Sequence, residues 1–316
     1  MSAYPRLLMR LSPKFSKTID LQKELENIQA GYNGEYRVDQ LIQETHFTLP
    51  FQTLPNVEIQ ASPNRLIQID ALIITPSYMC VLEVKHLRGT LKFLENPYQL
   101  IQTIDGNNTT YVCPQQQILR TVDSLEYWLQ HEVGIQLPIF KAIVLPNKRT
   151  HIEIPPTQIK LLGPKEVPLY LQKLNKHRAI ISTSQLQHII YKIKNSNKPY
   201  NAFPLAKKHS IPLDQLKTGI ICCCGGQGRR YSQRTWTCQT CGKNIDNAIK
   251  LAMQDWFWLF KSTITHKECS QYLQINNKNR ITKLLKQMNL TPTGHTRSRT
   301  YHYNYRKPLF KDTQSN

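Results

Sequence analysis

Two stretches decide the expected fold: Gln68-Ile69-Asp70, inside an apolar run, and Met79-Cys80-Val81-Leu82-Glu83-Val84-Lys85. Both runs are typical of strands, and Thr75-Pro76-Ser77-Tyr78 between them predicts a turn. A hairpin centred on that turn places Asp70 directly opposite Glu83. Side chains two positions apart on a strand share a face, so Lys85 lies beside Glu83. The sequence therefore predicts one polar site that contains two carboxylates and an ammonium.

This polar site has the composition of a divalent-metal site. Cross-strand partners lie about 4.5–5.5 Å apart at Cβ, and hard carboxylate oxygens suit Mg²⁺ or Mn²⁺ better than Zn²⁺. The alternative is a simple Glu83–Lys85 salt bridge at a strand end. Apolar neighbours favour the metal site, because burying unpaired charge costs several kcal/mol. His86 faces the opposite side of a regular strand, and we leave it outside the site.

Further motifs flank the hairpin in a fixed order. Ala30-Gly31-Tyr32-Asn33-Gly34-Glu35 precedes it, and Pro114-Gln115-Gln116-Gln117 opens a later helix. With the aspartate and the Glu-x-Lys strand, these motifs resemble the PD-(D/E)xK nuclease core. They are most similar to the nuclease-related domain (NERD) family, over roughly residues 20–150. The resemblance implies an α/β fold with a mixed central sheet flanked by helices, and it implies metal-dependent cleavage of phosphodiesters by Glu35, Asp70, Glu83, Lys85 and Gln117.

The resemblance also implies a role for each residue. Asp70 and Glu83 would hold Mg²⁺ or Mn²⁺, and Lys85 would orient the attacking water or neutralise charge in the transition state. Glu35 would add a carboxylate or a water-mediated ligand, and its alternative is an exposed acid favoured by the helix dipole. Gln117 would lie near the metal, although a glutamine at a helix start is often only polar surface.

The charge of the chain is unevenly distributed. The formal net charge is +20 over 316 residues. Residues 201–316 contain 19 Lys plus Arg against 5 Asp plus Glu, whereas the first 200 residues contain 22 against 16. Neutralised phosphates release counterions when nucleic acid binds. We therefore expect nucleic acid, most readily DNA, as the partner of the C-terminal third, and no membrane partner; the alternatives are a merely soluble basic surface or contact with an anionic membrane.

Five of the eight cysteines fall between positions 222 and 241. Cys238-Gln239-Thr240-Cys241-Gly242 has the spacing of a zinc knuckle. The partner knuckle is irregular, and Cys222 and Cys224 are the first choice there, with Cys223 able to replace either. The expected reducing compartment favours a structural zinc ribbon over disulfides, and a redox dithiol is the alternative. The predicted Zn²⁺ ligands are Cys222, Cys224, Cys238 and Cys241.

The remaining C-terminal sequence predicts a small basic module. Asp246–Phe260 has helical periodicity, Thr265-His266-Lys267-Glu268 forms a capping box, and an amphipathic helix follows around residues 281–288. A β-hairpin over residues 293–303 completes an order that resembles a winged helix. The alternative is a helical cap with a solvated basic tail. The residues expected to contact nucleic acid are Arg229, Arg230, Lys283, Lys286, Arg297 and Arg299.

These signals divide the chain into four expected parts. They are a nuclease-like domain over 15–150, a helical extension and linker over 151–215, a zinc ribbon over 216–245 and a basic module over 246–316. No run approaches the roughly 18 apolar residues that span a bilayer, and the start is a poor signal peptide. We expect a cytoplasmic nuclease. The rival hypothesis is a nucleic-acid-binding adaptor that keeps the nuclease fold without cutting.

Overall fold

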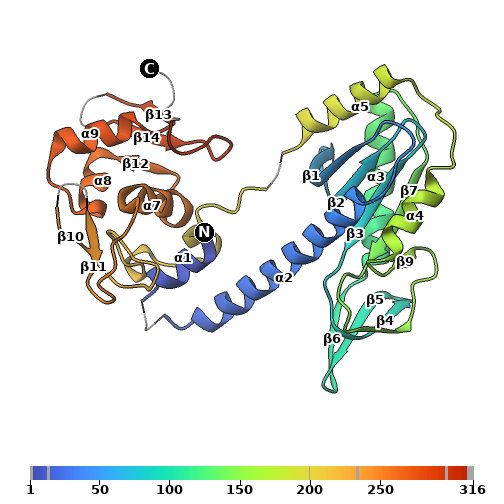
Figure 1. Ribbon diagram of the computed structural model, residues 1–316, viewed down its shortest axis with the longest axis horizontal. Coiled ribbons are helices and arrows are strands. Elements are labelled where there is room, and N and C mark those ends of the chain that lie inside the picture. The colour runs from blue at the N-terminus through green and yellow to red at the C-terminus, as the bar shows by residue number, and fades with distance from the viewer. Residues whose placement is uncertain (1–2, 13–14, 199, 233–234, 296–297, 312–316) are drawn as a thin grey trace. The chain divides into compact units, whose positions relative to one another are not determined.

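The computed structural model describes residues 3–12, 15–198, 200–232, 235–295 and 298–311. Contacts divide the chain into two compact units (Figure 1). The terminal unit contains Met1–Glu26 and Asn201–Asn316, and the central unit contains Asn27–Tyr200. The boundary falls within helix α2, Thr18–Gln43. Among the described residues, no helix is long and apolar enough to cross a membrane.

The central unit is built on a five-stranded mixed sheet. Its strand order is β1-β2-β3-β7-β9. The first three strands pair antiparallel, and β3, β7 and β9 pair parallel. The mixed central sheet that the resemblance implied is thus present, and β9 lies at its edge next to β7. The strand bounds are β1 Gln52–Ser62, β2 Arg65–Ile74, β3 Met79–Val84, β7 Ile139–Val144 and β9 Lys160–Leu162.

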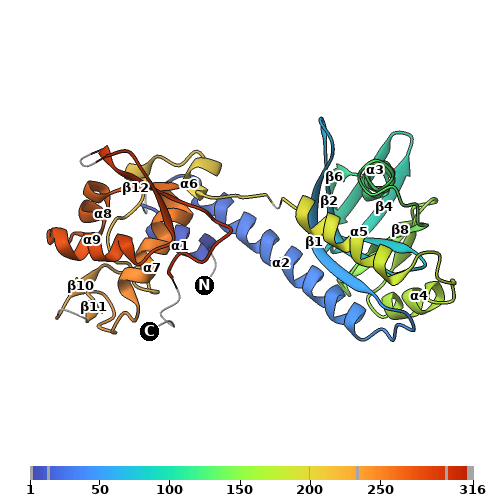
Figure 2. The same ribbon diagram turned by 90° about the horizontal axis from the view of Figure 1, so that it is seen from above.

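Helices cover both faces of this sheet, as Figure 2 shows. Helix α3, Pro114–Glu132, and α5, Thr183–Ser196, belong to the core cluster of one face. Helix α2 and α4, Glu166–Leu174, belong to the cluster of the other face. Every residue of β3 is buried as a result. A strand covered on both sides reads as a continuous apolar run, which makes Glu83 exceptional within it.

A second sheet of four strands, β6-β5-β4-β8, was not predicted from the sequence. Asp105 and Gly106 connect β5 to β6, with φ angles of 50° and 79°. Ile104 pairs with Asn107, so this is a two-residue hairpin loop of the kind that Asp-Gly favours. The dipeptide was an available signal for this hairpin. The strands are β4 Gly89–Glu95, β5 Tyr98–Ile104, β6 Asn107–Val112 and β8 Thr150–Ile154.

The terminal unit joins the first helix of the chain to the whole C-terminal third. Helix α1, Ala3–Arg10, and α6, Leu205–Lys208, share one core with the ribbon and the basic module. Leu205, within the expected extension and linker over 151–215, is fully buried in that core. The remaining elements of the terminal unit are a 3-10 turn at Leu213–Gln215, β10 Gly228–Arg230, β11 Trp236–Cys238, α7 Ala248–Asp255 with a π-helical continuation over Trp256–Phe260, β12 Thr263–Thr265, α8 His266–Leu273, α9 Lys278–Lys286, β13 Leu290–Thr293 and β14 Thr300–Tyr303.

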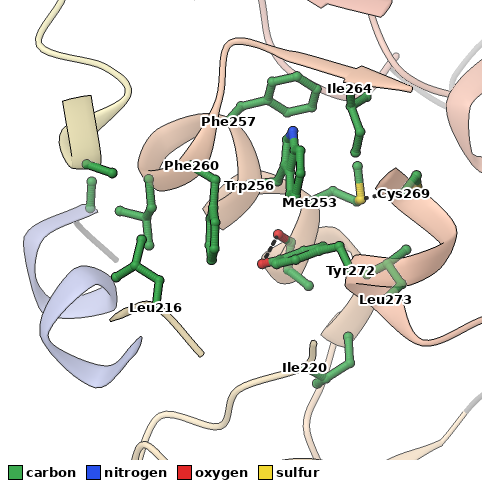
Figure 3. Packing of buried hydrophobic residues seen from close by; sticks show 14 of the residues in the cluster. Leu216, Ile220, Met253, Trp256, Phe257, Phe260, Ile264, Cys269, Tyr272 and Leu273 are labelled. Carbon is green, nitrogen blue, oxygen red and sulfur yellow. Dashed lines mark hydrogen bonds between the residues drawn. The ribbon is translucent and has the colours of Figure 1, made fainter. Parts of the chain in front are cut away.

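Aromatic side chains fill the core of the terminal unit (Figure 3). Trp256 and Phe260 stack at 5.6 Å between ring centroids, and Tyr272 meets both rings edge-on. The Tyr272 hydroxyl donates to the Ala252 carbonyl, 3.0 Å away, so its polar end is satisfied. The same core contains Leu7 from α1. Helix α1 is therefore an integral part of this unit.

A buried ion-pair network fastens α1 to the unit. Asp255 at the end of α7 accepts bonds from Arg6 at 2.9 Å and from Arg10 at 2.8 Å. Arg10 is fully buried and also donates to the carbonyls of Lys217 and Gly219. Such satisfaction is required, because an unpaired buried charge costs several kcal/mol. No sequence signal identified this network, since its partners are 249 and 245 residues apart.

Candidate active site

The hairpin of β2 and β3 has the register that the sequence predicted, and it brings Asp70, Glu83 and Lys85 together. Strands β2 and β3 pair with Ala71 opposite Leu82 and Ile74 opposite Met79, the register that brings Asp70 opposite Glu83. An Asp70 oxygen accepts the Val84 N–H at 2.8 Å. Lys85 follows β3 directly, and its Nζ lies 2.7 Å from Glu83 Oε1. The predicted salt bridge and the predicted carboxylate pair therefore coexist.

Glu35 reaches the same site from helix α2. It is half-buried, and burial raises its pKa, with a further rise from the nearby Asp70 carboxylate. This electrostatic coupling shows that Glu35 lies near the strand pair. The sequence supplied only the order of the motifs, because Glu35 and Glu83 come from elements separated by two strands.

Gly34 explains how α2 comes so close. A Cβ at this position would lie 3.1 Å from His86 Nδ1 and 3.1 Å from a Pro146 ring atom. Gly31, one turn earlier, has no such neighbour within 4 Å. A side chain at the closer position would require His86 or Pro146 to shift by a few tenths of an ångström. Gly34 therefore lets the helix bring Glu35 against the ends of β3 and β7.

His86 follows strand β3 and lies against helix α2. Val84, the last residue of β3, belongs to the core cluster that includes Val38 of α2, so both residues lie on the α2 side of the sheet. Its Nε2 is 3.4 Å from Asn147 Nδ2, and its buried Nδ1 has no hydrogen-bond partner among the described residues. The ring packs against Gly34. Its neighbours are Gly34 and Asn147, so His86 lies on the α2 side and stays outside the site, as expected from the sequence.

The carboxylates share an unfavourable electrostatic environment. Burial raises the pKa of Glu83 to about 7, with the Asp70 charge as the second cause. Burial also raises the pKa of Asp70, although the Val84 N–H and Lys85 oppose the rise. Like charges near one another and away from water disfavour ionisation. A divalent cation would offset this repulsion, and the oxygen donors present fit Mg²⁺ or Mn²⁺.

Gln117 lies half-buried in the first turn of α3, and its N–H donates to the Cys113 carbonyl. Helix α3 packs against the central sheet that carries Asp70 and Glu83. The neighbouring Gln115 is the structural glutamine of this motif. It is fully buried, donates to Glu95 at 3.0 Å and accepts from the Gln158 N–H at 3.0 Å.

Four cysteines of the terminal unit form a compact group. The Sγ atoms of Cys222, Cys224, Cys238 and Cys241 all lie within 4.8 Å of one another. Cys222 is 3.8 Å from Cys241, and Cys224 is 3.4 Å from Cys238. Zinc with bonds of about 2.3 Å separates tetrahedral sulfurs by about 3.8 Å. In the described parts of the chain, this is the one group with three or more ligand atoms at such distances.

The local backbone of the knuckle supports metal binding. The N–H groups of Cys241 and Thr240 lie 3.5 and 3.4 Å from Cys238 Sγ. The bond from Cys241 is the main reason that the pKa of Cys238 falls to about 6. The thiolate is the form that binds zinc. Gly242 closes the turn with a φ of 70°, which favours glycine.

The predicted basic residues that the structure describes are exposed on the terminal unit. They are Arg229 and Arg230 on β10, Lys283 and Lys286 on α9, and Arg299 before β14. Arg297 lies outside the described residues. Burial lowers the pKa of Arg280, and the charge of Arg230 lowers it further. The ribbon and α9 thus present neighbouring positive charges, and Arg280 was missed from the sequence.

The capping box at Thr265 is confirmed, because its hydroxyl accepts the Glu268 N–H at 3.1 Å and Glu268 accepts the Thr265 N–H at 2.8 Å. The strands of this region pair in the order β12-β14-β13. Helices α8 and α9 lie between β12 and β13 in sequence. The predicted helices and the hairpin that follows them are present, and β12, which was not predicted, joins the hairpin in one sheet.

Comparison with known proteins identifies the central unit. A family model described as the nuclease-related domain, NERD, matches residues 30–146. No curated protein and no solved structure matches the chain. The matched residues include Glu35, Asp70, Glu83, Lys85 and Gln117. Residues 30–146 therefore form a nuclease-related domain.

Proposed function

We propose that the protein is a metal-dependent nuclease that hydrolyses phosphodiester bonds in nucleic acid, with DNA as the expected substrate. The observation that supports this function best is Glu83, a buried carboxylate whose pKa is about 7 beside Asp70. The ammonium of Lys85 lies 2.7 Å from it. Keeping these charges at a buried strand end is costly for the fold, and catalysis is a reason to keep them.

Each side chain has a role that its position allows. Asp70 and Glu83 would hold the cation, and Glu35 would contribute a third carboxylate, directly or through water. Bound there, Mg²⁺ or Mn²⁺ would neutralise charge on the scissile phosphate and activate a water molecule. Lys85 would orient that water or stabilise negative charge in the transition state. Gln117 would use its amide to position water or substrate.

The terminal unit would attach the enzyme to nucleic acid. Its zinc ribbon would be closed by Cys222, Cys224, Cys238 and Cys241, a set with no position left for substrate. Exposed Lys283 and Lys286 on α9 and exposed arginines on β10 supply positive charge for phosphates. A winged-helix mode would place α9 in a groove and the β13–β14 hairpin on the backbone.

A cleavage assay tests the proposal. The purified chain is incubated with plasmid, single-stranded DNA and RNA, with Mg²⁺, Mn²⁺ or EDTA. We expect cleavage that EDTA abolishes. Asp70→Asn and Lys85→Ala should each lower the rate about a hundredfold or more, equivalent to about 3 kcal/mol of transition-state stabilisation.

The matched control is Glu153→Gln, which removes a partly exposed carboxylate that pairs with Lys92 in the second sheet. Its cleavage rate should equal that of the wild type. Binding of nucleic acid without cleavage under every metal condition would instead identify the non-cutting adaptor. Equal rates for Asp70→Asn and the wild type would remove the catalytic assignment.

A further inference from the structure

Two loops leave the central sheet at the edge where the carboxylates lie. One follows β3 and contains residues 85–88, and the other follows β7 and contains residues 145–149. Strands β3 and β7 are parallel, and Val84 pairs with Val144. The Lys85 N–H donates to the Val144 carbonyl at 3.0 Å. Both loops therefore start beside Glu83.

Hydrogen bonds join the two loops into one rigid edge. The Gly89 N–H donates to the Arg149 carbonyl at 2.9 Å. The Thr150 hydroxyl donates to the Leu87 carbonyl at 2.7 Å and to the Asn147 carbonyl at 3.0 Å. Helix α2 is tied to the same edge, because Arg37 Nη1 donates to the Pro146 carbonyl at 3.3 Å.

Three exposed cations occupy this edge: Arg88, Lys148 and Arg149. We call them the basic rim. Within the described part of the chain, none of these three side chains forms an ion pair with a carboxylate. The structural contacts of the two arginines use main-chain atoms: Gln102 donates to the Arg88 carbonyl, and the Arg149 N–H donates to Asn147 Oδ1. Main-chain atoms of the two arginines thus hold the loops in place, and their exposed guanidinium groups are available to contact a ligand.

The positive charge of the basic rim complements the negative charge of a phosphodiester backbone. The cluster of Glu35, Asp70 and Glu83 repels a phosphodiester backbone, so a substrate must be attracted by charges next to the cluster. The rim supplies three such charges on a preorganised edge. Guanidinium and ammonium groups on exposed loops contact phosphate without reading bases.

We propose that Arg88, Lys148 and Arg149 form a substrate-binding subsite that holds the phosphates next to the scissile bond. This inference rests on the proposed nuclease function and deepens it. The subsite recognises the nucleic-acid backbone, and it is separate from the attachment surface of the terminal unit. Its contribution is to binding, so its loss raises KM and leaves the chemical step intact.

The test uses the full chain and the variant Arg88→Ala/Lys148→Ala/Arg149→Ala. The matched control is Lys173→Ala/Lys176→Ala/Arg178→Ala, which removes the same charge from exposed residues of the same unit. The control residues lie at the other end of the sheet, because the Ser77 hydroxyl of the β2–β3 turn donates to the His177 carbonyl.

Two readouts separate the subsite from catalysis. In EDTA, anisotropy of a short DNA duplex measures affinity against salt. The rim variant should flatten the slope of log affinity against log salt by about 2–3, at about 0.9 per phosphate contact. With metal, its KM should rise about tenfold with kcat within about twofold of the wild type. The control should match the wild type in both.

The outcomes distinguish the two proposals. A flattened salt slope in a protein that cuts no substrate would support the rim and overturn the nuclease. Cleavage by the wild type, with rim variant and control indistinguishable in slope and KM, would overturn the rim and leave the nuclease standing. A fall in kcat at unchanged KM would also overturn the rim as a binding subsite.

Discussion

Replacing Glu83 by glutamine removes one buried charge and keeps the shape of the side chain. Glu83 is 2% exposed, and its pKa is about 7 in the fold against an ordinary 4.5. One unit of pKa corresponds to about 1.4 kcal/mol. Ionised Glu83 therefore lowers the free energy of unfolding of the metal-free central unit by up to about 3 kcal/mol.

The sign of the pH dependence follows from the raised pKa. Between pH 4.5 and about 7 the folded state holds a proton that the unfolded state has lost. The stability of the metal-free wild type therefore falls as pH rises through this window, and the loss is complete above it. Glu83→Gln lacks this contribution. We expect the variant to be more stable than the wild type by up to about 3 kcal/mol at pH 8, with little difference below pH 4.5.

Hydrogen exchange of peptides spanning β2 and β3 measures the difference in unfolding free energy between variant and wild type. It reports on the central unit within the full chain. In EDTA at pH 8, exchange in the variant should be about a hundredfold slower than in the wild type. Added Mg²⁺ should slow exchange in the wild type and not in the variant, because a bound ligand stabilises only the state that binds it. A variant that exchanges as fast as the wild type at pH 8 would refute the reasoning.

Four further substitutions test other parts of the structure. Gly31→Ala should raise the free energy of unfolding by up to about 1 kcal/mol, since its Cβ meets open space and Ala is the better helix former. Gly34→Ala should lower both this free energy and the cleavage rate, because its Cβ meets atoms at 3.1 Å; equal gains in urea denaturation would contradict the close approach. Cys238→Ser should release zinc, detected by elemental analysis, and increase proteolysis of the terminal unit alone. Asp255→Ala should destabilise that unit by about 3–5 kcal/mol in thermal unfolding, because it leaves Arg10 buried without its partner.

Local chemistry made part of the site readable from the sequence. The turn at residues 75–78 and the two apolar runs predicted the hairpin, and the observed register agrees with them. The regular knuckle and the neighbouring cysteines predicted the four thiols that the structure brings within 4.8 Å. In both cases the partners are close in sequence, so turn geometry and ligand spacing leave few alternatives.

Other parts could not be read because their partners are remote or their signals are weak. The second sheet was missed although Asp105-Gly106 marks one of its hairpins, and its parallel pairing of β4 with β8 joins strands far apart in the chain. The contact of Gly34 with His86 and Pro146 was not predicted, because the three residues come from segments far apart in the chain.

The sequence by itself determined the strand hairpin with Asp70 and Glu83, the nuclease-related motifs and the cysteine group. Within each of these motifs the residues are close in sequence, so local geometry specifies them. Tertiary structure alone decided that α1 belongs with the C-terminal third, through Arg10 and Asp255, and that Gly34 lets Glu35 approach the strands. Those arrangements depend on close packing and buried charge pairing between distant segments. Such interactions exist only after the chain has folded, so no local pattern specifies them.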